Sequence, residues 1–243
     1  MKIKSGLLIL CLFACVSARA QNWGGGVDDS NLHFGFTFQY LSSEYKILKR
    51  PDWREPYNKD MDPGQVAPGL TGISSDSSPG FGIGFVVNKR LIENADLRFT
   101  PILVFNDRIL TYHHDELKDN VERKISSTLV EFPLGIKLKS DRRNNFRAYM
   151  IGGAKYSMDI SSKKKTNNAN ITDPGEKMLN NVRNYLSYEA GLGFDLYFEY
   201  FKMSPEIKLS YSFNSVLKDE PNRYSYPIDK LMLRHVTFSL FFE

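Results

Sequence analysis

Cysteine is the scarcest chemically informative residue in this chain. Only Cys11 and Cys15 occur among its 243 residues, and both lie within the first twenty. If that segment is removed on export, the mature chain has no thiol. Disulfides, zinc–thiolate sites and cysteine nucleophiles are then excluded, so a secreted protein of this size must be stabilised in another way.

The first twenty residues resemble a secretory signal peptide. Lys2 and Lys4 form a basic start, and residues 7–16 form an apolar stretch too short to span a membrane. Small residues then supply a site for signal peptidase, which predicts a mature chain beginning at residue 21. The cleavage-site residues are Ala18, Ala20 and Gln21.

Long apolar runs and an excess of charge are also absent. No stretch of about 20 apolar residues occurs and the mean hydropathy is −0.37, which excludes a bundle of transmembrane helices. The net charge is +4, and the signal segment carries three bases and no acid, which leaves +1. A nucleic-acid partner therefore has no electrostatic basis.

Aromatic residues are plentiful, with 17 Phe and 13 Tyr, and many lie in segments that alternate apolar and polar residues. Such alternation predicts β-strands, and almost no helical periodicity is present. Eight strands of about ten residues predict an all-β fold, an eight-stranded antiparallel up-and-down transmembrane β-barrel over residues 31–243, after a signal peptide (1–20) and a periplasmic leader (21–30). The alternating segments are 32–40, 80–87, 96–106, 130–138, 146–159, 186–198, 203–213 and 235–242.

The connections between these segments differ in length in a regular way. Every second connection is short (88–94, 140–145, 199–202), and the others are long and polar (49–79, 112–124, 161–184, 214–230). Outer-membrane barrels keep short turns in the periplasm and long loops outside. This order of short and long connections predicts that the protein lies in the outer membrane of a Gram-negative bacterium, with its N-terminus in the periplasm.

Alternation alone does not separate a membrane barrel from a soluble barrel of the lipocalin type, which buries its apolar face. The second face here is rich in Gly and Ser and carries nearly balanced charges, which suits the narrow interior of an eight-stranded barrel better than a solvated surface. We therefore expect the charges to form a network in the lumen. Its members are Arg98, Glu131, Lys137, Arg147, Lys155, Glu189, Asp195, Glu206 and Lys208.

Five segments spread over nearly the whole mature chain resemble the PorT (SprT) family of outer-membrane β-barrel proteins of the Bacteroidota. The segments are 22–27, in which Trp23 precedes three glycines, 32–36, 78–85, 138–142 and 204–212. The resemblance implies a component required for the type IX secretion system, which exports proteins with C-terminal sorting domains and supports gliding in motile species. It implies no catalytic motif and no cofactor.

For the other candidate sites we expect no chemical function. His113, His114, Asp115 and Glu116 offer metal-ligand atoms, but adjacent strand residues point to opposite faces, so a solvated loop is expected rather than a metal site. A lysine run at 163–165 could pair with lipopolysaccharide phosphates or be a solvated loop. With only four histidines, and none with an obvious Ser partner, we expect no enzyme.

Two alternatives to the secretion role remain open from sequence. One is a generic small barrel acting in adhesion or membrane stabilisation, to which the long loops would be suited. The other, less favoured, is a lipid A-modifying enzyme. The expected partners are outer-membrane lipid and lipopolysaccharide and, if the secretion role holds, other type IX translocon subunits. Trp23 in its flexible segment is a candidate docking residue.

Overall fold

The computed structural model describes residues 30–55, 70–115, 120–161, 179–218 and 224–243. Within them there is no helix long and apolar enough to cross a membrane. The described residues form ten β-strands. In chain order these are β1 (Leu32–Lys49), β2 (Leu70–Ser74), β3 (Ser78–Ile92), β4 (Ala95–Phe99), β5 (Ile102–His114), β6 (Val121–Lys139), β7 (Phe146–Asp159), β8 (Asn184–Tyr197), β9 (Lys202–Ser212) and β10 (Ile228–Phe242).

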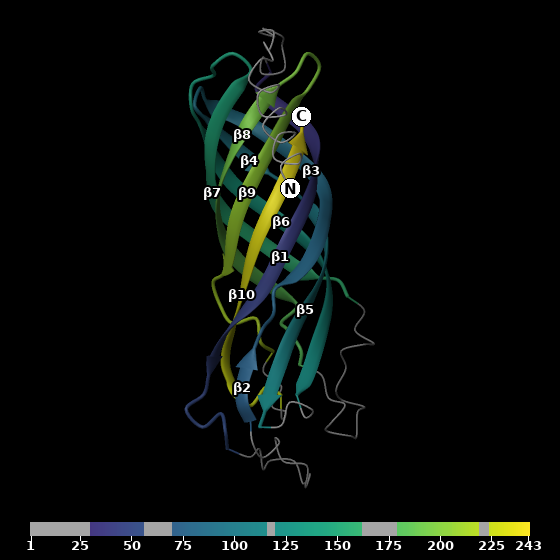
Figure 1. The fold of residues 1–243 in the computed structure, drawn as a ribbon. Helices are drawn as coiled ribbons and strands as arrows, with labels where there is room; N and C mark the ends of the chain where they lie inside the picture. Colours follow the sequence, from purple (N-terminus) through teal and green to yellow (C-terminus); the bar gives the residue numbers. More distant parts are fainter. Residues whose placement is uncertain (1–29, 56–69, 116–119, 162–178, 219–223) are drawn as a thin grey trace, which may run out of the picture.

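The strands form one closed antiparallel ring with eight positions (Figure 1). From β6 to β10 each strand pairs with the next one along the chain, and β1 pairs with both β10 and β3, which closes the ring. β4 and β5 share one position between β3 and β6. The eight-stranded up-and-down barrel predicted from alternation is therefore confirmed.

The third barrel position is interrupted where a proline lies in the strand. Pro101 has no N–H to donate, so the ladder breaks between β4 and β5. The register nevertheless continues, because Phe85 N–H donates to the Pro101 carbonyl over 3.0 Å and Thr100 N–H donates to the Pro133 carbonyl over 3.1 Å. β2 pairs only with the far end of β5 and lies outside the eight ring positions.

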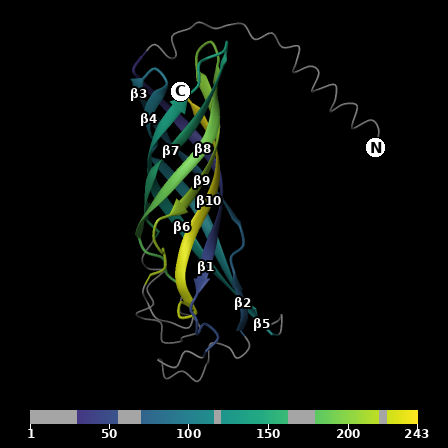
Figure 2. The ribbon, with the colours of Figure 1, turned by 90° about the vertical axis from the view of Figure 1, so that its left-hand side faces the viewer.

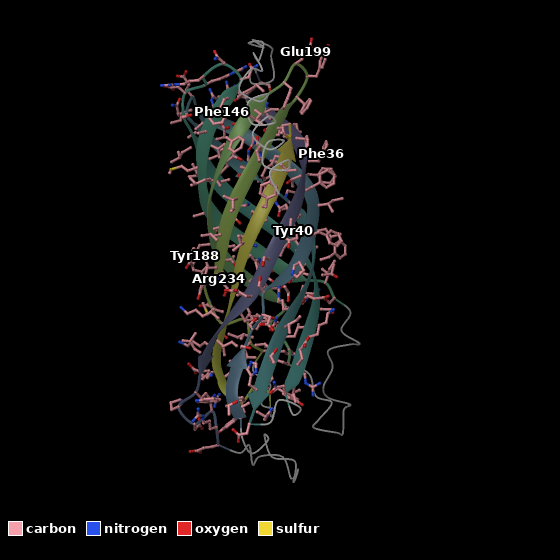
Figure 3. The ribbon with its side chains drawn as sticks, viewed as in Figure 1. Phe36, Tyr40, Phe146, Tyr188, Glu199 and Arg234 are labelled. Atoms are coloured by element: carbon pink, nitrogen blue, oxygen red, sulfur yellow. The ribbon has the colours of Figure 1, made fainter. Side chains whose placement is uncertain are left out.

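A band of exposed apolar side chains runs around the outside of the barrel, along the half of its axis that carries the short turns. Along β1, Phe36 and Tyr40 are exposed while Thr37 and Gln39 between them are buried. In Figure 3, Phe146 and Phe36 lie closer than Tyr40 and Tyr188 to the end that carries Glu199, and all four side chains are exposed. The other exposed apolar residues include Phe34, Phe38, Phe81, Ile83, Phe85, Leu134, Ile136, Leu138, Leu192, Phe194, Ile207, Leu209 and Phe238.

The band has the dimensions of a bilayer core. On β1 it runs from Leu32 to Tyr40, and a tilted transmembrane strand needs roughly 9–11 residues. Because water would not solvate so many large apolar side chains, the band is the lipid-facing wall.

Several strands continue well past the band, which differs from the strands of about ten residues expected from sequence. β1 has 18 residues and β6 has 19. The connection expected at 112–124 is short, because β5 runs to His114 and β6 begins at Val121. The sequence did not predict these longer strands, because the outward side chains become polar beyond the band and the segments then look like polar loops.

Beyond the band the barrel is apolar inside and polar outside. Along β1, Glu44 and Lys46 point outward while Tyr45 is buried. The enclosed side chains form an apolar core. It includes Leu41, Tyr45, Leu70, Ile73, Leu110, Tyr112, Leu129, Leu179, Tyr185, Val216, Tyr224, Ile228, Leu231 and Leu233.

The two ends of the barrel differ as the connection lengths predicted. The β3–β4, β6–β7 and β8–β9 turns lie at the end where β1 begins and β10 finishes, and β1, β5, β7 and β9 finish at the opposite end (Figure 2).

Candidate functional site in the barrel interior

The interior at the level of the apolar band is polar and holds paired charges. Strand alternation aims every second side chain inward, and burial in a narrow lumen makes each charge depend on a nearby counter-charge. Among the described residues, six ion pairs of 3.0 Å or less join side chains that are at most 6% exposed. They are Arg98–Glu206 (2.9 Å), Lys137–Asp195 (2.7 Å), Lys139–Asp96 (2.6 Å), Lys155–Glu131 (2.9 Å), Lys202–Glu243 (2.6 Å) and Lys208–Glu189 (3.0 Å).

Arg98 occupies the centre of the cluster nearest the short turns. Its Nη1 donates to Glu206 and its Nε donates to Asn88 Oδ1 over 2.8 Å. Glu243 lies 3.4 Å from Nη2, and the guanidinium stacks 4.4 Å from the centre of the Phe241 ring. Arg98 therefore ties β4 to β3, β9 and β10 across the lumen.

Lys137 and Asp195 form the best-defined pair. The Lys137 ammonium donates to both Asp195 oxygens, at 2.7 and 2.9 Å, and lies 3.9 Å from the centre of the Tyr149 ring. Ser204 donates to the same carboxylate over 2.5 Å. Both charged side chains are essentially inaccessible to solvent, so their mutual contact replaces hydration.

A second layer lies toward the long connections. Lys155 donates to Glu131 and, over 3.4 Å, to His235 Nδ1, while Ser157 donates to Glu131 over 3.2 Å. Lys208 contacts Glu189 and also lies 3.5 Å from Glu206, which links this layer to the Arg98 cluster.

The structure brings eight of the nine residues expected in the lumen into these pairs. The ninth, Arg147, is half-buried at the short-turn end, opposite Asp195 in the β7–β8 register. Sequence reasoning missed Lys139, Lys202 and Glu243 because each was assigned to a strand end or turn. It missed Arg108 because the third strand was expected to end at residue 106, although the inward alternation continues through Asn106, Arg108 and Leu110.

His113 and His114 lie at the end of β5 and are not arranged as metal ligands. His113 Nε2 lies 2.7 Å from the Ser74 hydroxyl, across the β2–β5 ladder, and His114 N–H bonds to Asn120 Oδ1 over 2.9 Å. Glu116 lies outside the described residues. No group of three or more His, Cys, Asp or Glu side chains that could hold a metal occurs in the part of the chain that the structure describes.

The Ser74–His113 contact, which sequence reasoning missed, is the shorter of two serine–histidine contacts in the described residues; the other joins Ser30 to His33 over 3.5 Å. A serine hydrolase needs an acid that orients the histidine and donors for an oxyanion. In the described part of the chain, no hydrogen bond joins an acid to His113. The contact fits a cross-strand hydrogen bond between two neighbouring strands.

Several sequence-based candidates fall outside the described residues. These are the signal cleavage site at Ala18, Ala20 and Gln21, the candidate docking residue Trp23, and the lysine run at 163–165.

Comparison with known proteins gives one family. A family model described as "Outer membrane protein beta-barrel domain" matches residues 20–218. No curated protein matches the chain in sequence.

Among solved structures, the chain resembles the attachment invasion locus protein Ail of Yersinia pestis. The identity is 9%, the TM-score is 0.38, and the match covers 86% of this chain and 96% of Ail. It also resembles the outer membrane protein AlkL (10% identity, TM-score 0.38, 92% of this chain and 94% of AlkL). A third is the translocator domain of the autotransporter NalP from Neisseria meningitidis (7% identity, TM-score 0.33, 90% of this chain and 91% of that domain).

Proposed function

Since the chain belongs to the outer membrane protein beta-barrel domain family, and is thus an outer-membrane β-barrel, we propose that it serves as a non-enzymatic subunit required for type IX protein secretion. The choice of secretion system rests on the PorT-like segments of the sequence. Four of the five lie in described residues, and all four overlap barrel strands.

The filled interior supports a role as a scaffold. Arg98 and Lys137 are fully buried in the lumen at the level of the band, and Leu110 and Leu231 are fully buried in the core beyond it. An eight-stranded barrel encloses little more than its own side chains, so an exported protein would have to travel by another route. The barrel therefore acts through its surfaces, by holding other subunits in or beside the membrane.

We propose that the short-turn end faces the periplasm. β1 begins and β10 finishes at that end, as expected for a barrel whose leader and short turns lie on the periplasmic side of the membrane. The ordered extension then projects outward, and other translocon subunits contact the barrel at the periplasmic rim or along the lipid-facing wall.

A second candidate, adhesion or membrane stabilisation, draws on the extension itself. Strands that continue beyond the membrane around an apolar core form a rigid platform for the long connections. Such a platform would present a surface for binding outside the cell.

Deletion of the gene, followed by mass spectrometry of the secreted proteins and of lipid A, separates these functions. We expect proteins with C-terminal sorting domains to disappear from the medium while lipid A acylation stays unchanged, and re-expression of the full chain to restore secretion. Normal secretion would contradict the proposal, and would favour adhesion if surface attachment fell. Altered lipid A acylation would indicate an enzyme.

A further inference from the structure

Arg108 is an exception among the buried cations of this barrel. Its side chain is fully buried, yet no carboxylate of the described residues lies within 4.0 Å of it. Every other fully buried Lys or Arg of the interior has a carboxylate oxygen within about 3 Å, as given above. Arg108 Nη2 donates a hydrogen bond to the Tyr185 hydroxyl over 3.3 Å, and the guanidinium lies 5.9 Å from the centre of the Tyr45 ring and interacts with that side chain as well.

Unused polar atoms gather at the same level of the barrel. Arg108 Nε has no hydrogen-bond partner, and neither do His235 Nε2 and Ser127 Oγ, all on buried side chains. Ser127 is on the neighbouring strand, opposite Asn106 and on the inward face that also carries Arg108. His235 and Arg108 are close enough to interact electrostatically.

The Asp159 carboxylate acts on Arg108 without contacting it. Asp159 interacts electrostatically with Arg108, but it is only half-buried and its Oδ1 accepts the Ser161 N–H over 2.8 Å. A guanidinium cannot lose its proton to escape burial, so the charge persists. An uncompensated buried charge is strongly destabilising, which calls for an anion supplied from outside the chain.

We propose that the barrel binds one small monovalent inorganic anion, of the size of chloride, between Arg108, Ser127 and His235. The site lies at the junction of the polar lumen and the apolar core. Along the inward faces, the buried Leu110 follows Arg108 toward the extension, whereas the buried Leu129 and the Lys155–Glu131 pair lie on the other side of Ser127, toward the short turns. This enclosure favours a single-atom anion over an organic carboxylate or phosphate. A water molecule would satisfy the hydrogen bonds without supplying the missing negative charge.

The first test uses the purified full-length protein in detergent, with bromide as the probe. Ionic strength is held constant with gluconate, which is too large for the site. We expect the thermal midpoint to rise with the logarithm of bromide concentration, because an ion that binds only the folded state stabilises it by mass action. Crystals grown in bromide should show an anomalous peak beside the Arg108 guanidinium. A midpoint independent of bromide would overturn the proposal.

Variants locate the effect. Arg108→Met should abolish the bromide dependence, and Arg234→Met, which removes an exposed arginine paired with Glu44, should preserve it. If Arg108→Met does not fold, Ser127→Asp decides the question: a carboxylate beside Arg108 should replace the ion, so this variant should be stable in gluconate and insensitive to bromide. Wild-type sensitivity in Ser127→Asp, or in a folded Arg108→Met, would refute the site.

Discussion

At the scale of single residues, the interior charges stabilise the barrel only as complete sets. Lys137 and Asp195 are both removed from water, and each compensates the desolvation of the other. Outside the band the rule is weaker, because exposed pairs such as Lys124–Asp107, at 2.7 Å, keep most of their hydration.

We expect Lys137→Met to lower the free energy of unfolding by about 3–5 kcal/mol, because it leaves Asp195 as an unpaired buried charge. The double variant Lys137→Met/Asp195→Leu should recover most of this loss. Urea titration of the protein folded in detergent, for the wild type, both single variants and the double variant, measures the coupling. Additive losses in the double variant would show that the two charges do not depend on each other.

The extension contains a pH-sensitive contact between two long connections. Tyr226 donates a hydrogen bond to Asp52 Oδ2 over 2.6 Å, and this bond lowers the pKa of Asp52 below its ordinary value. A lowered pKa means that the contact contributes fully above the ordinary aspartate pKa and is lost as the pH falls through the lowered value. We expect Tyr226→Phe to raise the Asp52 pKa toward normal, as measured by carboxyl NMR.

Tyr40→Phe is the matched control for that measurement, because Tyr40 lies on the lipid-facing wall. It should leave the Asp52 pKa unchanged. An equal shift in both variants would mean that the Tyr226 hydrogen bond is not its cause.

At the scale of one strand, β1 presents two environments on a single outward face. Phe36 points into the apolar band, whereas Leu48, an even number of residues further on, lies beyond it and beside charged neighbours. The strand and the direction of the side chain are the same, so only the distance along the barrel differs.

Phe36→Arg should therefore cost about 2–4 kcal/mol of folding free energy in a bilayer, and Leu48→Arg close to nothing. Refolding into lipid vesicles, followed by the heat-modifiable shift in gel mobility, measures both. Equal losses would place the membrane boundary elsewhere on β1.

Two adjacent glycines on β7 allow packing on the inward face of the barrel to be compared with packing on its outward face. A Cβ at Gly153 would collide with the backbone of Leu134 and Gly135 on β6, whereas a Cβ at Gly152 would meet nothing closer than 3.9 Å. Gly153→Ala should lower the unfolding free energy by about 1–3 kcal/mol. Gly152→Ala should change it by less than about 0.5 kcal/mol. Urea titration of both variants gives the comparison, and a costly Gly152→Ala would point to a contact on the outer wall.

At the scale of the whole molecule, the barrel is filled in two different ways along its axis. Ion pairs occupy the half that the apolar band surrounds, and an apolar core fills the extension. In the membrane the outer surface contacts lipid and polar side chains turn inward, whereas beyond the membrane water contacts the outer surface and apolar side chains turn inward.

This double filling predicts a barrel closed to ions. We expect no stable single-channel conductance in planar bilayers, because Arg98 and Lys137 block the lumen and Leu110 and Leu231 block the extension. A porin with more strands, in the same bilayers, serves as the positive control. Long-lived open channels would indicate a wider barrel or an oligomeric pore.

The sequence by itself determined the number of positions in the ring, the lipid-facing residues and most of the charged lumen, because each depends on period-two alternation and on the order of short and long connections. Tertiary structure decided what alternation does not encode. It decided that β1, β5 and β6 continue beyond the band, since the outward face turns polar after Tyr40 on β1 and after Phe105 on β5, where water replaces lipid. It also decided which charges pair, because partners such as Arg98 and Glu206 lie on strands distant in sequence and meet only when the ring closes.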